Sequence, residues 1–156
     1  MVSHPAAPAV TPSAVRAALA EVPDPEIPTV SITDLGIVDR IDVGPDAIRV
    51  DLLPTFVGCP ALEVIRAAVE DRLAVFGRPA RVEFTFERPW TTARLTDAGR
   101  DGLRRAGIAP PTDGAVCCPY CASTKVAMDN LFGPTLCRML YYCRECRQPF
   151  EAFKPL

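Results

Sequence analysis

The chain has 156 residues, of which 49% are hydrophobic, and its formal net charge is −2 at pH 7. This length is typical of one domain, or of one domain with a small appendage, and the apolar fraction is ample for a buried core. A weakly acidic chain is not expected to act mainly on nucleic acid, because binding to phosphates needs an excess of lysine and arginine.

The cysteines are interpreted as free or metal-bound thiols rather than as a disulfide framework. Their number, seven, is odd, and the first twelve residues are rich in alanine and proline, with no apolar run long enough for a secretory signal or a membrane span. We therefore expect a cytoplasmic protein without membrane association, in which thiols stay reduced.

The first predicted element is a short helix after Thr11. Threonine is a good N-cap, and the proline that follows it is favoured in a first helical turn. The next residues place apolar side chains at i, i+3, i+4 and i+7, which is one helix face. A proline-rich segment, residues 23–28, then ends the helix and predicts an extended loop that carries Asp24 and Glu26.

Two strands, a long helix and a third strand are predicted next. The strands over residues 37–43 and 48–53 flank a Gly-Pro-Asp turn, and the helix over residues 60–77 opens at a proline and closes at a glycine. The third strand covers residues 81–87. A helix between two neighbouring strands makes a parallel crossover. The predicted fold class is therefore α/β (α+β), a small sheet with helices packed on it in the order helix-strand-strand-helix-strand.

The rest of the sequence adds a second folded unit. A short polar helix is predicted over residues 96–106, and the proline-rich stretch after it has the composition of a linker. We expect a disordered tail (1–12), a first domain (13–108), a linker (109–114) and a second unit (115–156). This second unit is close to the size at which a hydrophobic core alone no longer stabilises a fold.

Two CxxC pairs lie in the second unit, Cys118 with Cys121 and Cys143 with Cys146. Each CxxC turn holds two thiolates close together, so two facing turns offer a tetrahedral set of sulfurs. The pattern is typical of a structural zinc site, which would supply on the order of 10 kcal/mol of folding free energy, and iron remains the alternative. The first pair also has the pattern of a redox dithiol, but it lacks the strand before it and the long helix after it that such a motif needs.

A C-terminal zinc ribbon should therefore contain a β-hairpin and a final strand. Strands are predicted over residues 125–132 and 136–143, around a Gly-Pro turn, and over residues 150–153. Two further cysteines lie in this unit. Cys117 is out of CxxC register, and Cys137 is either an additional sulfur for ligand exchange or a buried core residue.

Cys59 is the predicted metal-handling position of the first domain. With Pro60 in the first helical turn, Cys59 becomes the N-cap, where backbone N–H groups and the helix dipole should lower the pKa of the thiol. Thr55 could place a hydroxyl group beside it, and Asp24 and Glu26 could join it around an iron ion or cluster if their loop folds over the helix start. The alternatives are an unreactive buried cysteine and acidic residues that serve only as solvated turn formers.

Several segments carry a family resemblance. Residues 22–60 contain Val-Pro-Asp-Pro-Glu-Ile-Pro, Ser-Ile-Thr-Asp-Leu-Gly-Ile-Val and Pro-Thr-Phe-Val-Gly-Cys-Pro, and they resemble the iron–sulfur cluster assembly domain family. Pro-Trp-Thr-Thr at 89–92, Gly-Ile-Ala-Pro-Pro at 107–111, and Phe-Gly-Pro-Thr and Pro-Phe-Glu-Ala-Phe-Lys in the ribbon narrow this resemblance. Together the two modules resemble the D subunits of the bacterial phenylacetyl-CoA ring epoxidase system.

The resemblance implies an accessory or maturation subunit of the multicomponent phenylacetyl-CoA 1,2-epoxidase of aerobic phenylacetate catabolism. Oxygenase chemistry belongs to other subunits with a di-iron centre, and a reductase carries flavin and a [2Fe–2S] cluster. Cys59 matches the family's Gly-Cys-Pro cysteine, which is suspected of handling a cluster. The expected role is to assist iron–sulfur cluster or iron insertion into the oxygenase and reductase partners, with a transient cluster or iron at Cys59, zinc in the ribbon, and a possible homodimer.

The residues themselves agree with a role that is not catalytic. The single histidine, His4, lies in the predicted tail, so neither a histidine-based triad nor a histidine-ligated di-iron site can be built. No glycine-rich nucleotide motif occurs. Two other functions stay open: a structural adaptor without cluster chemistry, and a nucleic-acid-binding zinc ribbon, although residues 115–156 carry only five lysines and arginines against three acidic residues.

Overall fold

The computed structural model describes residues 10–155. Most of the tail predicted over residues 1–12 lies outside this range. Pro12, however, already belongs to the first helix, so the tail ends earlier than predicted. The reason is that proline is accommodated in the first turn, where its missing N–H would have no partner in any case.

The first sheet has the strand order β1-β2-β3, formed by β1 (Val38–Val43), β2 (Ile48–Leu52) and β3 (Ala80–Phe84). β1 and β2 are antiparallel, and β2 and β3 are parallel, which confirms the predicted crossover. Alternate residues of β2, beginning with Ile48, are buried, while those between them point to the other face. The sheet therefore has one face on the core and one polar face.

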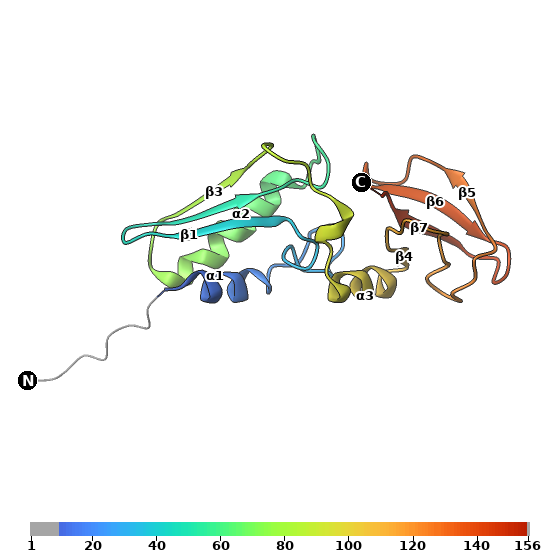
Figure 1. The fold of residues 1–156 in the computed structure, drawn as a ribbon, viewed down its shortest axis with the longest axis horizontal. Coiled ribbons are helices and arrows are strands. Elements are labelled where there is room, and N and C mark those ends of the chain that lie inside the picture. The colour runs from blue at the N-terminus through green and yellow to red at the C-terminus, as the bar shows by residue number, and fades with distance from the viewer. Residues whose placement is uncertain (1–9, 156) are drawn as a thin grey trace, which may run out of the picture.

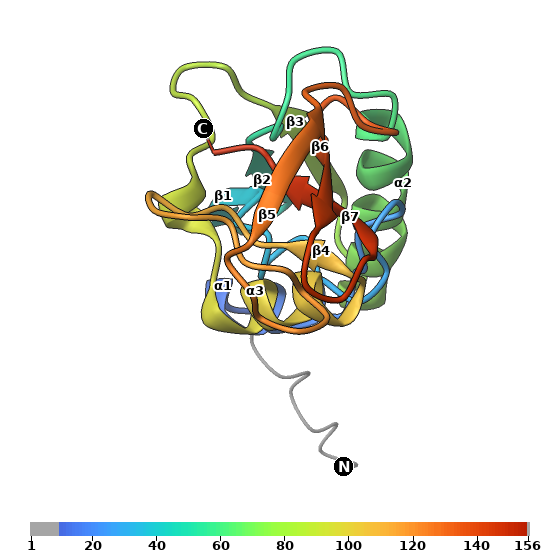
Figure 2. The same cartoon turned by 90° about the vertical axis from the view of Figure 1, so that its right-hand side faces the viewer.

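Two helices pack on each other and on this sheet, α1 (Pro12–Leu19) and α2 (Leu62–Leu73) (Figures 1 and 2). The predicted cap of α1 is confirmed, since the Thr11 side chain accepts a hydrogen bond of 3.1 Å from the backbone N–H of Ala14. A 3-10 turn prolongs α2 as far as Gly77, which takes a left-handed conformation with φ of 63°. In the described part of the chain, no helix combines the length and the apolar character needed to cross a membrane.

Helix α3 (Asp97–Arg105) lies against the proline-rich loop that precedes the first sheet. Thr96 caps it through a 3.0 Å hydrogen bond from the backbone N–H of Gly99. The helix approaches the loop closely because Gly102 has no side chain; a Cβ there would come within 2.6 Å of the Thr29 carbonyl oxygen. The Thr29 hydroxyl donates a 2.8 Å hydrogen bond to the Gly102 carbonyl and closes this contact.

The second sheet has the order β4-β7-β6-β5, formed by β4 (Ile108–Ala109), β5 (Val126–Asn130), β6 (Arg138–Cys143) and β7 (Pro149–Phe153). The predicted hairpin and final strand are present. Ala109, expected to begin a linker, is instead a buried strand residue that pairs with β7. A two-residue strand has no alternating pattern that sequence could reveal.

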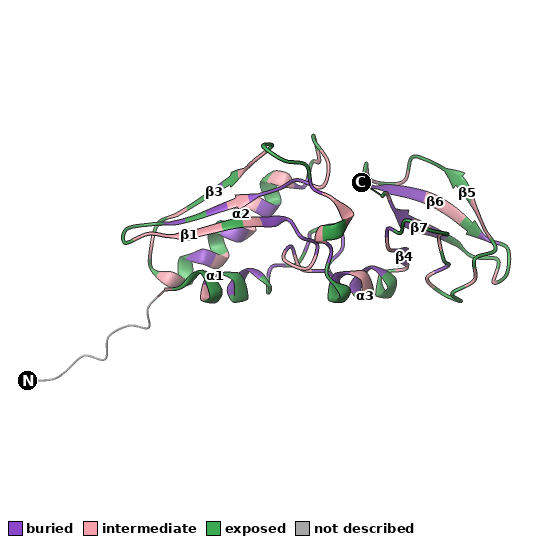
Figure 3. Ribbon diagram, in the orientation of Figure 1, coloured by how far each residue is buried: buried purple, intermediate pink, exposed green. Residues whose placement is uncertain are grey.

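The two sheets lie end to end along the long axis of the molecule, and the main core continues from one to the other (Figures 1 and 3). Phe153 at the end of β7 packs against Trp90, with ring centroids 5.6 Å apart. Trp90 in turn donates a 2.9 Å hydrogen bond to the Leu35 carbonyl. The ribbon is thus docked on the first domain through buried side chains, and Cys137 is part of the same core.

Candidate metal centre and thiol cavity

Four cysteine thiols come together at the end of the ribbon. The sulfur atoms of Cys118, Cys121, Cys143 and Cys146 all lie within 4.8 Å of one another. Two of the distances are 3.7 Å, between Cys118 and Cys146, and 3.6 Å, between Cys121 and Cys143. In a tetrahedral site with Zn–S bonds of about 2.3 Å, neighbouring sulfurs are about 3.8 Å apart. The arrangement therefore fits a zinc ion with little movement, and all four predicted ligands are brought together.

The two CxxC turns have the same backbone geometry. The residue after each second cysteine, Ala122 and Arg147, has a positive φ of 61° and 60°, respectively. In the second turn, the backbone N–H of Cys146 donates towards the Cys143 sulfur and lowers the pKa of that thiol to about 7, whereas burial raises the pKa of Cys146 to about 12. A bound metal ion would displace the protons from all four thiols, because only thiolates ligate zinc.

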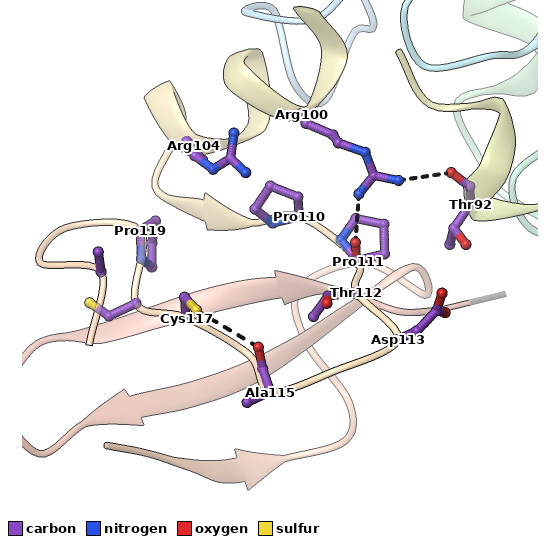
Figure 4. Close-up of a pocket in the computed structure, with 12 residues that line it drawn as sticks. Thr92, Arg100, Arg104, Pro110, Pro111, Thr112, Asp113, Ala115, Cys117 and Pro119 are labelled. Carbon is purple, nitrogen blue, oxygen red and sulfur yellow. Dashed lines mark hydrogen bonds between the residues drawn. The ribbon is translucent and has the colours of Figure 1, made fainter. Parts of the chain in front are cut away.

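Cys117 does not belong to this quartet. Its side chain is exposed, and its sulfur lies 3.8 Å from the Ala115 carbonyl oxygen (Figure 4). It lines a polar cavity of about 420 Å³ at the seam between α3 and the ribbon. Here Arg100 donates hydrogen bonds to the carbonyl oxygens of Pro111 (2.7 Å) and Thr92 (3.3 Å), so the guanidinium group ties the connecting segment to the first domain (Figure 4).

Cys59 occupies a different position from the one predicted. Helix α2 begins at Leu62 and its N-cap is Ala61, which makes no side-chain hydrogen bond. Cys59 lies two residues before the cap, because Pro60 is part of a turn and not of the first helical turn. The predicted fall in the pKa of Cys59 was also wrong: burial raises it, one backbone N–H, that of Ala61, opposes the rise, and the charge of Glu26 adds to it.

The thiol of Cys59 faces a small cavity instead. Its side chain is half-buried, and together with Glu26 and Phe56 it lines a space of about 180 Å³. The opposite wall comes from the ribbon, from the segment Gly133–Cys137. Cys137 therefore shares this cavity with Cys59, although the sequence offered only ligand exchange in the ribbon or a core position for it. The buried sulfur in the loop before β6 carried no signal of contact with the first domain.

Asp24 and Thr55 do not line this cavity. Asp24 is 6% exposed, and one carboxylate oxygen accepts hydrogen bonds of 2.9 Å from the backbone N–H groups of Glu26 and Ile27. It shapes its own loop, and burial raises its pKa. Thr55 lines a separate apolar cavity beside Trp90. Of the four residues predicted around the iron site, the structure brings Cys59 and Glu26 to one cavity.

The fold and the cysteine quartet define a two-module protein, an iron–sulfur-assembly type of α/β domain followed by a zinc ribbon. Residues 12–85 match the family model described as "Iron-sulfur cluster assembly protein", and residues 108–154 match the "PaaD zinc beta ribbon domain". The chain is 37% identical over 149 residues, 90% of each chain, to an Escherichia coli (strain K12) protein that is named as the D subunit of 1,2-phenylacetyl-CoA epoxidase. The chain belongs to this family of D subunits.

Two solved structures share the fold of the first domain. One is a domain of unknown function, DUF59, from Bacillus anthracis (TM-score 0.54, 24% identity, 58% of this chain and 89% of that chain). The other is the conserved hypothetical protein TM0487 from Thermotoga maritima (TM-score 0.52, 28% identity, 60% of this chain and 94% of that chain). Both similarities cover most of the other chain but little more than half of this one, in keeping with an added ribbon.

Proposed function

We propose that the protein is an accessory subunit of a phenylacetyl-CoA 1,2-epoxidase and that it assists the insertion of iron or an iron–sulfur cluster into the oxygenase and reductase subunits. The observation that carries the proposal is the cavity at Cys59, a half-buried free thiol beside the carboxylate-bearing residue Glu26. Its domain matches a family of iron–sulfur cluster assembly proteins, and the relative from Escherichia coli is named as an epoxidase subunit.

The chemistry of the cavity suits a transient ligand better than a permanent one. A thiol with a raised pKa stays protonated at neutral pH, so it binds a metal ion only by releasing its proton. The carboxylate of Glu26, acting on the same cavity, attracts a cation and offers an oxygen ligand. Weakly held cargo can be passed on, whereas the compact quartet of the ribbon is suited to keeping its ion.

The zinc ribbon has a structural part in this proposal. The cluster of buried residues belonging to the ribbon alone is small, and two of its members, Cys118 and Cys143, are members of the quartet. Zinc would thus hold together a sheet whose own core is insufficient. The docked ribbon then presents a fixed surface to the partner subunits.

Co-expression of the epoxidase subunits with variants of this chain tests the proposal. The oxygenase and reductase would be purified and their iron, acid-labile sulfide and epoxidation of phenylacetyl-CoA measured. With Cys59→Ser we expect the iron and sulfide of the partners to fall towards the level found without this chain. Cys117→Ser, which changes an exposed thiol outside the cavity, should leave them unchanged. Fully loaded partners with Cys59→Ser would instead support a structural adaptor.

A further inference from the structure

Cys137 reaches the cavity of Cys59 from the other module of the protein. It precedes β6, in the segment that follows the Gly133–Pro134 turn, and both thiols line the same space of about 180 Å³. The Cys137 sulfur contributes to the raised pKa of Cys59, and the charge of Glu26 acts on the pKa of both thiols. Two sulfur atoms and one carboxylate, drawn from two modules, therefore face one cavity.

The position of Cys137 is fixed by contacts on both sides of it. The backbone N–H of Lys154 donates a 2.8 Å hydrogen bond to the Cys137 carbonyl. The next residue, Arg138, forms an ion pair of 2.6 Å with Glu151 and donates a 3.2 Å hydrogen bond to the Glu26 carbonyl. One arginine thus connects the strand that follows Cys137 to the loop that carries Glu26.

The surroundings of the Cys137 sulfur are not those of an ordinary core cysteine. The hydroxyl oxygen of Thr135 lies 3.2 Å from this sulfur and can donate a hydrogen bond to it once the thiol has lost its proton. The volume of the cavity is about six times the share of one water molecule in the liquid, about 30 Å³. A metal ion with an additional ligand can be accommodated there.

We propose that Cys59 and Cys137 are the two thiolate ligands of one metal site between the modules, that Glu26 supplies an oxygen ligand, and that the cargo is iron(II). Binding one Fe²⁺ forms two Fe–S bonds and releases two protons, one from each thiol. The identity of the cargo rests on the proposed function, whereas the pairing of the thiols rests on the cavity. The ribbon then completes the carrier site, which exists only while the two modules are docked.

This site is distinct from the zinc quartet in its geometry. Among the residues that the structure describes, only the quartet has three or more ligand atoms gathered within 4.8 Å. The inter-module site is more open, and its ligands must close on the ion. Two thiolates and one carboxylate hold iron less firmly than four thiolates hold zinc, as a site of transient loading requires.

Iron binding by the zinc-loaded full chain tests the pairing. Ferrous ion would be added without oxygen, and the bound iron and the sulfur-to-iron absorption would be measured after desalting. We expect the wild type to bind one iron beyond its zinc, and Cys59→Ser and Cys137→Ser each to lower the affinity by about tenfold or more, at least the cost of losing an outer partner of a ligand. Cys117→Ser is the matched control and should bind as the wild type does.

The outcomes separate this inference from the proposed function. If Cys137→Ser binds iron like the wild type while Cys59→Ser does not, the second ligand is refuted and the carrier role of Cys59 survives. If both variants lose iron but the partner subunits are still fully loaded, the site stands and the maturation role fails. Zinc content and thermal unfolding would show whether a variant is folded.

A covalent bridge tests the same geometry without any substitution. Dichloroacetone is a small reagent that joins two thiols only when both reach it, and it would be applied to the zinc-loaded wild type. Digestion and mass spectrometry should give a linked pair of peptides containing Cys59 and Cys137, formed less when iron(II) is added first. Alkylation of Cys59 without any linkage to Cys137 would overturn the inference, even if the Cys137 variants were misfolded.

Discussion

The ion pair between Arg138 and Glu151 offers the sharpest test of how the ribbon is held. Its N–O distance is 2.6 Å, and the two side chains are only 9% and 28% exposed. Arg138→Met keeps most of the aliphatic length but leaves the Glu151 carboxylate without its partner. It also removes the hydrogen bond to the Glu26 carbonyl.

The expected cost follows from the burial of the pair. Removing one partner of a fully buried pair costs about 3–5 kcal/mol. The partial exposure of Glu151 reduces this cost to about 2 kcal/mol, because water screens the remaining charge. The lost hydrogen bond adds about 1 kcal/mol. A total of about 3 kcal/mol should lower the melting temperature by about 6–12 °C in a protein of this size.

The chain contains a matched control for this experiment. Arg104 and Asp101 form a pair of similar length, 2.7 Å, but their side chains are 53% and 63% exposed. Arg104→Met should cost about 0.5 kcal/mol or less, because exposed pairs are screened by solvent. Thermal unfolding of the zinc-loaded proteins, followed by circular dichroism, measures both. Equal shifts for the two variants would refute the argument from burial.

Three further predictions concern the ribbon and its junction with the first domain. Excess zinc chelator should remove hydrogen-exchange protection from β5, β6 and β7 while α2 stays protected; simultaneous loss in both sheets would contradict this. Phe153→Ala should cost about 3–4 kcal/mol and shift the emission of Trp90 to longer wavelength, since the ring that covers the indole is lost; unchanged emission would argue against the contact. Because burial raises the pKa of Cys59, its alkylation should be slower at pH 7 than that of a free cysteine and should still accelerate above pH 9, so a rate that levels off below pH 8 would show an activated thiol.

The raised pKa of Cys59 also fixes a direction for stability. The folded chain holds this proton more tightly than the unfolded chain does. The resulting contribution to stability is therefore fully present below the ordinary thiol pKa and is lost as the pH rises through the raised one. Replacing the thiol with serine should remove this alkaline dependence.

Much of the fold follows from local patterns in the sequence. The alternation in β2 and the cap of α1 at Thr11 need no information from distant residues. The same holds for the metal quartet, since each CxxC turn brings its two sulfurs together through its own backbone. These features were predictable because short-range geometry decides them.

The start of α2 shows where local rules fail. Proline after Cys59 satisfies the rules for a first helical turn, but the chain makes another turn there and the helix begins later, at Leu62. The predicted activation of the thiol depended on that boundary, and helix ends are the positions that sequence determines least well. An error of two residues reversed the expected direction of the pKa shift.

The partner of Cys59 could not be found from the sequence for a different reason. Cys137 comes from the other module, and the two meet only because the ribbon packs on the first domain. The contacts that fix this docking, such as the rings of Trp90 and Phe153, join residues distant in the chain. No periodicity or motif in one segment records such a contact.

Stability and metal handling are linked through the same arginine. Arg138 follows Cys137 in the chain and donates to the carbonyl of Glu26, so it holds both walls of the cavity as well as the ribbon. At a temperature where Arg138→Met is still folded and zinc-loaded, we expect it to bind iron(II) more weakly than the wild type, whereas Arg104→Met should bind normally. If iron affinity is unchanged while the melting temperature falls, the arginine stabilises the junction without shaping the cavity, because a site shared between modules must respond to a loosened junction.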